Sequence, residues 1–296
     1  MRGLAVLSVA FAACWFVGPV LWASEPRFLK YSGPPVPLYG LTVAAPWENG
    51  GTFMYNLPEH LEITYGGQGI LRNTDEVPAG HWQAAEDGRS AVLDVESTTI
   101  PGTRVKGMAK VAGADRIELT IRVENGSTTV MPGLWPMYCF QYRQLTGFPQ
   151  WQDNFKHTYV IIDGKVVALA DVETQTADTR VKGAAVRGVP QPRNKFADRY
   201  GGVIEEGIDR AIIAVTSLDG RRKVVVAWTP GQAMLSNSRI PCMHADPYYG
   251  PLKPGESLEA NGVVIFTEEP VEEVMLGLMK AGVGAPPATA GAVGAE

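Results

Sequence analysis

The sequence predicts an all-β fold, a large antiparallel β-sandwich of the supersandwich kind with one short C-terminal helix. Many short segments alternate apolar and polar residues, which is the period-two pattern of half-buried strands. Several pairs of such segments flank an Asp-Gly dipeptide, a strong signal for a β-hairpin turn. A helical pattern occurs only near the C-terminus. Many strands, tight turns and one late helix are typical of two packed sheets.

The expected strands follow one another along the chain. Residues 90–100 and 116–125 alternate apolar and polar side chains. The segments 158–171 and 211–228 each hold an Asp-Gly pair between β-branched runs, which predicts two hairpins. The segment 252–266 begins with a Pro-Gly turn and ends in an apolar strand. We therefore expect a single β domain over residues 24–268.

The C-terminal part of that last segment contains Asn261-Gly262, which predicts a second turn before the final strand. A helix is expected over residues 269–282, because Pro270 suits a first helical position and Gly282 can end it. Residues 283–296 have little to bury and are expected to form a disordered tail. The polar, Pro-containing segment 186–202 is predicted to be a lid-like loop within the domain.

Residues 1–23 are typical of a secretory signal peptide. One Arg precedes an apolar run from Leu4 to Leu21, and small residues follow at Ala23 and Ser24, so cleavage after Ala23 is expected. The run is close to the roughly 20 apolar residues that span a bilayer, so an uncleaved membrane anchor is the alternative. We expect a secreted or periplasmic protein with no stable membrane span after cleavage.

Charge and sequence motifs limit the classes of partner and cofactor that this protein is expected to bind. The formal net charge is −5, and the longest basic cluster, residues 220–223, is short. A nucleic-acid partner would require a basic stripe that neutralises phosphates, so nucleic acid is not expected. The sequence also has no Gly-x-Ser-x-Gly motif and no Gly-rich loop that opens a helix, which argues against a serine hydrolase and a nucleotide cofactor. We expect no cofactor, and the sequence carries no signal of an oligomeric state.

The segment "PCMHADPYYGPLKPGES" carries the strongest candidate site. Side chains two residues apart on a strand point to one face, so Cys242, His244 and Asp246 are expected to project together. A neighbouring carboxylate can orient an imidazole and raise its pKa, which predicts His244 as a general acid or base and Asp246 as its partner. The alternative is a structural His beside a disulfide.

A second stripe lies in "CFQYR". Cys139, Gln141 and Arg143 share one face of the expected strand, and Gln and Arg are suitable donors to sugar hydroxyls or carboxylates. The alternative is an ordinary solvent-facing stripe. Cys139 and Cys242 form an even pair in an exported chain, which predicts a disulfide.

Zinc is the alternative for the same residues, Cys139, Cys242, His244 and Asp246, because thiolate, imidazole and carboxylate are all zinc ligands. The chain has no Cys-x-x-Cys and no His-x-x-x-His spacing, and an exported protein tends to oxidise paired thiols. The sequence therefore predicts no metal site.

Further contacts to a sugar are expected from aromatic and polar residues in or beside loops. Flat rings can stack on pyranose faces, although Trp and Tyr also serve as sandwich core residues. The candidates are Trp151, Asp153, His157, His81 and Tyr248.

The segments "ADRIELTIRVENGSTTVMPGLWPMYCFQY" and "LKPGESLEANGVVIF" resemble the central strands and closing turn of galactose mutarotase-like proteins. Within that superfamily the chain is similar to secreted members that share C-x-Q, W-x-D and C-x-H-x-D-P arrangements. The resemblance implies a β-supersandwich that handles carbohydrate on one concave sheet. An epimerase of this kind would also need a late-strand Glu base, and residues 224–238 contain no carboxylate. That departure argues against mutarotase activity.

The sequence thus predicts an exported carbohydrate-active protein that binds or acts on a poly- or oligosaccharide. A lyase, hydrolase or epimerase with His244 as acid or base is one form of this hypothesis. A non-catalytic carbohydrate-binding sandwich is the alternative, and a structural envelope protein is a second alternative. An acid–base reaction needs a second titratable group, for which Asp153, His157 and Arg143 are candidates.

Overall fold

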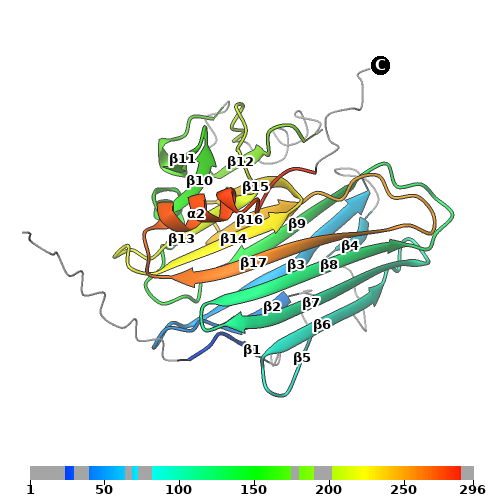
Figure 1. Cartoon of the computed structure of the whole chain (residues 1–296), viewed down its shortest axis with the longest axis horizontal. Helices are drawn as coiled ribbons and strands as arrows, with labels where there is room; N and C mark the ends of the chain where they lie inside the picture. Colours follow the sequence, from blue (N-terminus) through cyan, green and yellow to red (C-terminus); the bar gives the residue numbers. More distant parts are fainter. Residues whose placement is uncertain are drawn as a thin grey trace, which may run out of the picture.

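The computed structural model describes residues 24–29, 40–63, 69–72, 82–174, 180–189 and 202–287. The described chain forms two large antiparallel sheets packed face to face, with one α-helix, as Figure 1 shows. This is the all-β sandwich that the sequence predicts. The predicted signal peptide, most of the predicted lid-like loop and the last nine residues lie outside the described residues.

One sheet has eight strands in the order β1-β2-β3-β9-β16-β15-β12, and β4 pairs with β3 beside this path. Its strands are β1 Arg27–Leu29, β2 Gly40–Ala44, β3 Thr52–Ile63, β4 Gly69–Arg72, β9 Leu134–Gln141, β12 Val181–Ala185, β15 Gly231–Asn237 and β16 Cys242–Pro247.

The other sheet has nine strands in the order β11-β10-β13-β14-β17-β8-β7-β6-β5. Its strands are β5 Gln83–Ala84, β6 Ser90–Glu96, β7 Thr103–Gly113, β8 Arg116–Asn125, β10 Thr158–Ile162, β11 Lys165–Ala168, β13 Ile212–Thr216, β14 Lys223–Thr229 and β17 Ser257–Thr267. Two short 3-10 helices, Trp151–Lys156 and Leu169–Asp171, flank β10 and β11.

Both predicted hairpins are present. Asp163 and Gly164 join β10 to β11 with positive φ angles of 51° and 71°, the conformation that a tight Asp-Gly turn requires. Asp219 and Gly220 lie in the longer loop, residues 217–222, that joins β13 to β14, and Gly220 has φ 70°. The expectation that residues 116–125 form a strand is also confirmed, because β8 covers that range.

The turn predicted at Asn261-Gly262 is wrong, because β17 runs through both residues without a break. Gly262 lies opposite Trp228 in the neighbouring strand β14. A Cβ atom on Gly262 would come within 2.6 Å of the Trp228 ring, so glycine makes room for the indole there. This glycine therefore serves close packing and not a turn.

The main core fills the space between the sheets. Phe53 of β3 packs against Phe140 of β9 with ring centroids 4.5 Å apart, and against Phe266 of β17 across the core at 5.7 Å. The indole Nε1 of Trp228 donates a hydrogen bond of 2.7 Å to the Tyr55 hydroxyl. These contacts join the two sheets, and they fix which face of each strand points inward.

Helix α2, Val271–Lys280, is the helix that the sequence predicts at the C-terminus. Its Met275 is buried in a separate apolar cluster with residues of β10, β13, β14 and β17, among them Ile212 and Val225. The helix therefore covers part of the outer face of the nine-stranded sheet (Figure 1). In the described part of the chain, no helix has the length and apolar character needed to cross a membrane.

Candidate functional site

The candidate site lies on the face of the eight-stranded sheet that points away from the other sheet, here called the outer face. In β9, Tyr138 and Phe140 belong to the main core, so Cys139 and Gln141 point outward. In β16, Met243 and Ala245 belong to the main core. Cys242, His244 and Asp246 therefore share the outer face, as strand alternation requires.

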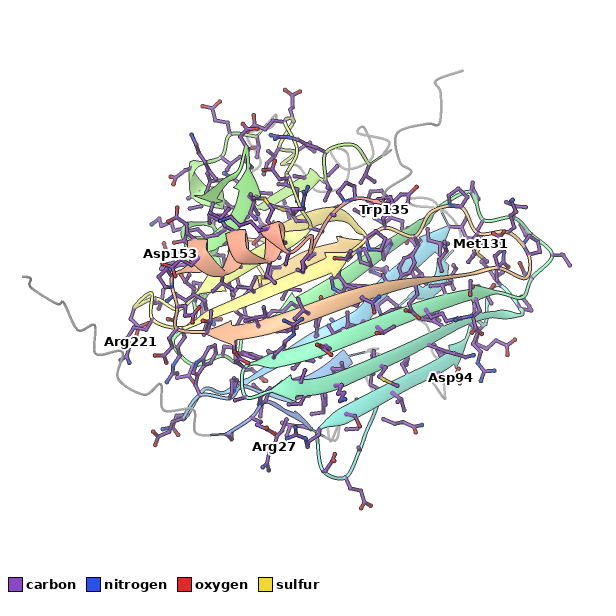
Figure 2. The ribbon with its side chains drawn as sticks, in the orientation of Figure 1. Arg27, Asp94, Met131, Trp135, Asp153 and Arg221 are labelled. Carbon is purple, nitrogen blue, oxygen red and sulfur yellow. The ribbon has the colours of Figure 1, made fainter. Side chains whose placement is uncertain are left out.

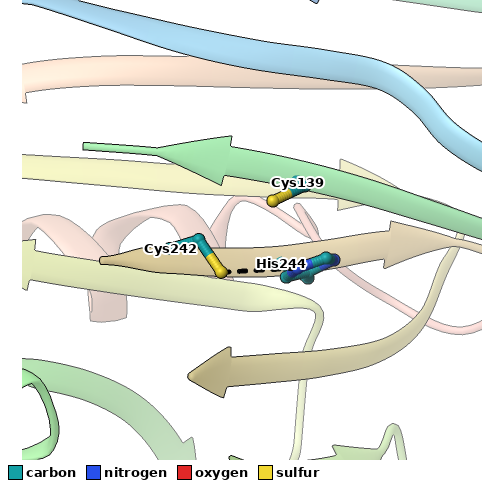
Figure 3. Close-up of side chains that lie close together, drawn as sticks. All are labelled: Cys139, Cys242 and His244. Atoms are coloured by element: carbon teal, nitrogen blue, oxygen red, sulfur yellow. Dashed lines mark hydrogen bonds between the residues drawn. The ribbon is translucent and has the colours of Figure 1, made fainter. Parts of the chain in front are cut away.

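Pairing of β9 with β16 brings the two predicted stripes together. His244 lies directly opposite Cys139, and Cys242 lies opposite Gln141. The ligand atoms of Cys139, Cys242 and His244 all lie within 4.8 Å of one another, and all three residues are buried. Cys242 Sγ and His244 Nε2 are 3.8 Å apart (Figure 3).

The disulfide predicted between Cys139 and Cys242 is not formed in this structure, where both thiols are free. The register gives the physical reason, because the residue opposite Cys139 is His244 and Cys242 is its diagonal neighbour. Diagonal pairs on adjacent strands are farther apart than the roughly 4 Å between Cβ atoms that a disulfide needs. The same register places the imidazole beside both sulfurs.

The three groups change one another's pKa values. A hydrogen bond with Cys139 and the nearby His244 lower the pKa of the Cys242 thiol to about 6, although burial opposes this. Burial lowers the pKa of His244, but Cys242 and the neighbouring carboxylates outweigh it and raise the value to about 9. The hydrogen bond with Cys242 and burial raise the pKa of Cys139 well above its usual value. At neutral pH these shifts favour a Cys242 thiolate beside a His244 imidazolium.

Asp246 has a different contact from the one expected. Its Oδ1 accepts a hydrogen bond of 2.8 Å from the backbone N–H of Tyr138. Burial raises the pKa of Asp246 to about 7, which the positive charge of His244 and the Tyr138 N–H partly oppose. Asp246 therefore fastens the end of β16 to β9, and its effect on His244 is electrostatic.

Strand β3 adds two polar residues that the sequence analysis did not propose. Asn56 pairs with Cys139, and the next pair along the ladder is His60 with Met137, so residues 57–59 form an irregularity in β3. The charge of Glu59, in that irregularity, raises the pKa of both His244 and Cys242. Pro58 was the available sequence signal, because proline inside a strand marks a bulge or an edge.

Asn56 is fully buried on the outer face. Gly40, opposite it on β2, leaves room for the amide, since a Cβ atom there would lie 2.8 Å from Asn56 Oδ1. Neither the oxygen nor the nitrogen of this amide has a hydrogen-bond partner among the described residues. The same holds for Nδ1 of His244. Buried polar atoms of this kind mark a place where a bound molecule can supply the missing hydrogen bonds.

Several predicted contact residues lie elsewhere. Asp153 is exposed and pairs with Lys156 at 2.9 Å, and Figure 2 shows it at the far end of the sheet from Trp135. His157 Nδ1 lies 3.2 Å from the Thr216 hydroxyl, beside the nine-stranded sheet. Tyr248 packs against the main core. These three therefore do not join the Cys139–Cys242–His244 cluster.

Of the remaining candidates, Gln141 is half-buried on the outer face and forms a hydrogen bond with the Cys139 thiol. Arg143 is exposed just beyond the end of β9. The Trp151 side chain and His81 lie outside the described residues. Among the candidates proposed for the second acid–base group, the structure places none in the cluster, and Asp246 and Glu59 are the carboxylates whose charges act on His244.

No protein-family model and no curated protein sequence matches the chain. Solved structures with a similar arrangement include a TPR-domain containing protein from Parabacteroides distasonis, with 9% identity and a TM-score of 0.39 over 78% of this chain. The chain spans 47% of the length of that protein.

A putative aldose 1-epimerase from Escherichia coli K12 is similar over 73% of this chain and 84% of its own, with 12% identity and a TM-score of 0.38. A putative mutarotase from Salmonella typhimurium is similar over 83% of this chain and 98% of its own, with 9% identity and a TM-score of 0.35. Several similar structures thus carry the names of putative aldose 1-epimerases or mutarotases, the class that the sequence resembles. Each TM-score lies below 0.5, so these likenesses carry no argument about what the chain binds.

Proposed function

We propose that this protein is an exported carbohydrate-binding protein and that the outer face of its eight-stranded sheet holds the saccharide. The observation that carries the proposal is the pair of buried, unpaired polar groups on that face, the Asn56 amide and His244 Nδ1. Each such group costs about 1–3 kcal/mol when it is left without a partner. A ligand rich in hydroxyls relieves this cost, because each hydroxyl both donates and accepts hydrogen bonds.

Neighbouring side chains suit the same ligand. Glu59 and Gln141 are half-buried at this face and offer acceptors and a donor for hydroxyl groups. Trp135, at the start of β9, lies in an apolar cluster on the outer face with Met137 and Leu235. Sugar sites combine such an apolar surface with a few placed polar groups. The resemblance of the sequence to galactose mutarotase-like proteins motivates the choice of carbohydrate among polyhydroxyl ligands.

The geometry favours binding over turnover for His244. Its Nε2 faces the Cys242 sulfur, and the carboxylate of Asp246 accepts a backbone N–H from Tyr138. An acid–base reaction also needs a second titratable group across the substrate, and Asp153 and His157 lie away from the cluster. Binding therefore requires fewer changes in the positions of side chains than a lyase, hydrolase or epimerase reaction would.

The test is a screen of poly- and oligosaccharides against the purified protein, followed by calorimetry on any ligand found. We expect Asn56→Ala to weaken binding by roughly tenfold or more, because the ligand loses hydrogen bonds in a buried site. Asn261→Ala is the matched control, since Asn261 lies on the exposed face of the other sheet, where it bonds to Thr120.

Circular dichroism must show that both variants are folded. Equal loss of affinity in Asn56→Ala and Asn261→Ala would count against the site. If no glycan binds the wild-type protein, the proposed carbohydrate-binding function is wrong. Chromatography of the incubated glycans measures turnover, and products that disappear in His244→Gln would replace the binding proposal with an enzymatic one.

A further inference from the structure

The cluster of Cys139, Cys242 and His244 has the composition and spacing of a metal centre. Two sulfurs and one imidazole nitrogen gather within 4.8 Å on one face of the sheet. In a tetrahedral zinc site, bonds of about 2.3 Å to sulfur and about 2.1 Å to nitrogen separate those two ligand atoms by about 3.6 Å. The observed separation of Cys242 Sγ and His244 Nε2 is 3.8 Å, close to that value.

The way in which the strands supply these ligands explains why local sequence motifs did not reveal them. Cys242 and His244 stand two residues apart on β16, so both point to the outer face, and β9 places Cys139 directly opposite His244. Each ligand is thus held by a strand whose register is fixed by the core on its other face. A rigid framework of this kind keeps ligands in place before the metal arrives.

The donor set selects the kind of ion. Thiolate and imidazole ligands suit Zn²⁺ and other soft or borderline ions, whereas Mg²⁺ and Ca²⁺ prefer oxygen. All three side chains are at most 3% exposed. The two sulfurs bind a metal as thiolates, and the divalent cation compensates their negative charge in this buried site.

We propose that the chain binds Zn²⁺ through Cys139 Sγ, Cys242 Sγ and His244 Nε2. Three protein ligands leave the fourth tetrahedral position to a water molecule or to a group from the surroundings, and Glu59 is the half-buried carboxylate whose charge acts on this cluster. All three ligands bind in their deprotonated forms, so coordination releases to solvent whatever protons the two sulfurs and Nε2 of His244 still hold. The zinc proposal does not depend on carbohydrate binding. Both use His244, but zinc takes its Nε2, whereas the saccharide is assigned to Nδ1 and to the Asn56 amide.

A disulfide competes with this site for the same sulfurs. The diagonal relation of Cys139 and Cys242 disfavours the disulfide, because the strands would have to shift to bring the two Cβ atoms to the roughly 4 Å that an S–S bond requires. Zinc requires the sulfurs to stay about 3.8 Å apart, which diagonal side chains reach more easily. Metal binding would in turn protect both thiols from oxidation.

The experiment uses the full chain purified under reducing conditions and titrated with Zn²⁺, and separately with Co²⁺ as a spectroscopic probe. We expect about one metal ion per chain and a sulfur-to-cobalt charge-transfer absorption, which reports thiolate ligation. Cys139→Ser, Cys242→Ser and His244→Gln should each weaken zinc binding by about 100-fold or more, since even loss of an outer-shell partner costs 10–100-fold. His157→Gln is the matched control, because that imidazole lies beside the other sheet and should leave the affinity unchanged.

A variant that fails to fold would bind no metal for a trivial reason, so zinc-edge X-ray absorption of the wild-type protein supplies an independent measurement. It should show about two sulfur neighbours near 2.3 Å and about one nitrogen neighbour near 2.1 Å. The proposal is overturned if the reduced wild-type protein binds no zinc, if the absorption spectrum shows only oxygen or nitrogen neighbours, or if folded cluster variants bind as tightly as the control.

Discussion

The outer faces of the two sheets differ sharply in the exposure of their polar residues. On the nine-stranded sheet, β6 and β8 alternate buried and exposed side chains, and their polar residues form solvent-exposed ion pairs. Arg104 Nη2 lies 3.1 Å from Asp94 Oδ2, with both side chains about half exposed. Asp94 is labelled in Figure 2. On the eight-stranded sheet, β16 is buried at all six positions.

This difference separates polar residues that only solvate a face from polar residues that make a site. Exposed ion pairs are screened by water and contribute about 0–1 kcal/mol each. Buried polar groups cost free energy unless something satisfies them, so they persist where a partner, a ligand or a metal ion does so. The two outer faces should therefore respond differently to metal ions, to substitutions and to pH.

The largest effect should come from zinc, which acts on the eight-stranded sheet alone. At a free concentration about 1,000 times its dissociation constant, an ion that binds only the folded state adds about 4 kcal/mol to the free energy of unfolding. We expect the melting temperature of the reduced protein to rise with zinc and to fall again with a chelator. Cys242→Ser should abolish the response. Identical melting curves with and without zinc would contradict the prediction.

The apolar residues of the two outer faces provide the second test. Leu235, 4% exposed, packs with Trp135 and Met137 on the eight-stranded sheet, whereas Met108, 55% exposed, lies on the nine-stranded sheet. Leu235→Ala should destabilise the protein by about 2–4 kcal/mol through lost burial and a cavity. Met108→Ala should change stability by about 0.5 kcal/mol or less. Urea unfolding of both variants measures the change in the free energy of unfolding. Similar decreases in the two variants would contradict the proposed difference between the outer faces.

Two aspartates provide the third test. Asp246→Ala leaves the buried N–H of Tyr138 without its acceptor, which should cost about 1–3 kcal/mol. Asp94→Ala removes only an exposed ion pair with Arg104 and should cost about 0.5 kcal/mol. Unfolding in denaturant compares the two, and Asp246→Asn, which keeps an acceptor oxygen, should recover most of the loss. An Asp246→Ala protein as stable as Asp94→Ala would show that the bond does not fasten β16.

The smallest effect concerns acid pH and the nine-stranded sheet. A hydrogen bond from Lys106 lowers the pKa of Glu124, with further contributions from Arg122 and Arg104. A carboxylate whose pKa is lowered by folding stabilises the protein above its unfolded pKa of about 4.3, and the gain is lost as the pH falls through the lower folded value. Because the pair is open to water, we expect only a few tenths of a kcal/mol.

The measurement is the melting temperature between about pH 5 and pH 3 for the wild-type protein and for Glu124→Gln, which should lose less on acidification. About 0.5 M salt should reduce the difference, since exposed pairs are screened. A difference that grows with salt would be inconsistent with a solvated ion pair.

Much of the fold could be predicted because it depends on local rules. The turns at residues 163–164 and 219–220 each place a glycine at positive φ, which glycine tolerates, and both hairpins formed there. The turn predicted at Asn261-Gly262 was wrong for a nonlocal reason, because Gly262 makes room for the Trp228 ring on a neighbouring strand. A dipeptide indicates which backbone conformations are accessible, but it does not indicate which side chains pack against it.

In the candidate site, too, local patterns could be predicted from the sequence and nonlocal contacts could not. Alternation placed Cys139 with Gln141 and Cys242 with His244 and Asp246, because a strand's side chains have a period of two whatever its neighbours are. The sequence could not show that Asn56 and Glu59 of β3 reach this face, because the irregularity after Asn56 changes the alternation. It also could not exclude Asp153 and His157, whose distance from the cluster is set by the path of the chain between the sheets.

The strands, the late helix and the two stripes of polar residues follow from local sequence patterns, because each depends on side chains a few positions apart. The pairing of β9 with β16, about a hundred residues apart in the chain, follows from the three-dimensional fold, and its register sets His244 opposite Cys139. Pairing between distant strands is chosen by the packing of the whole core, in which Phe53, Phe140 and Phe266 meet. The proposed metal centre is a consequence of that choice.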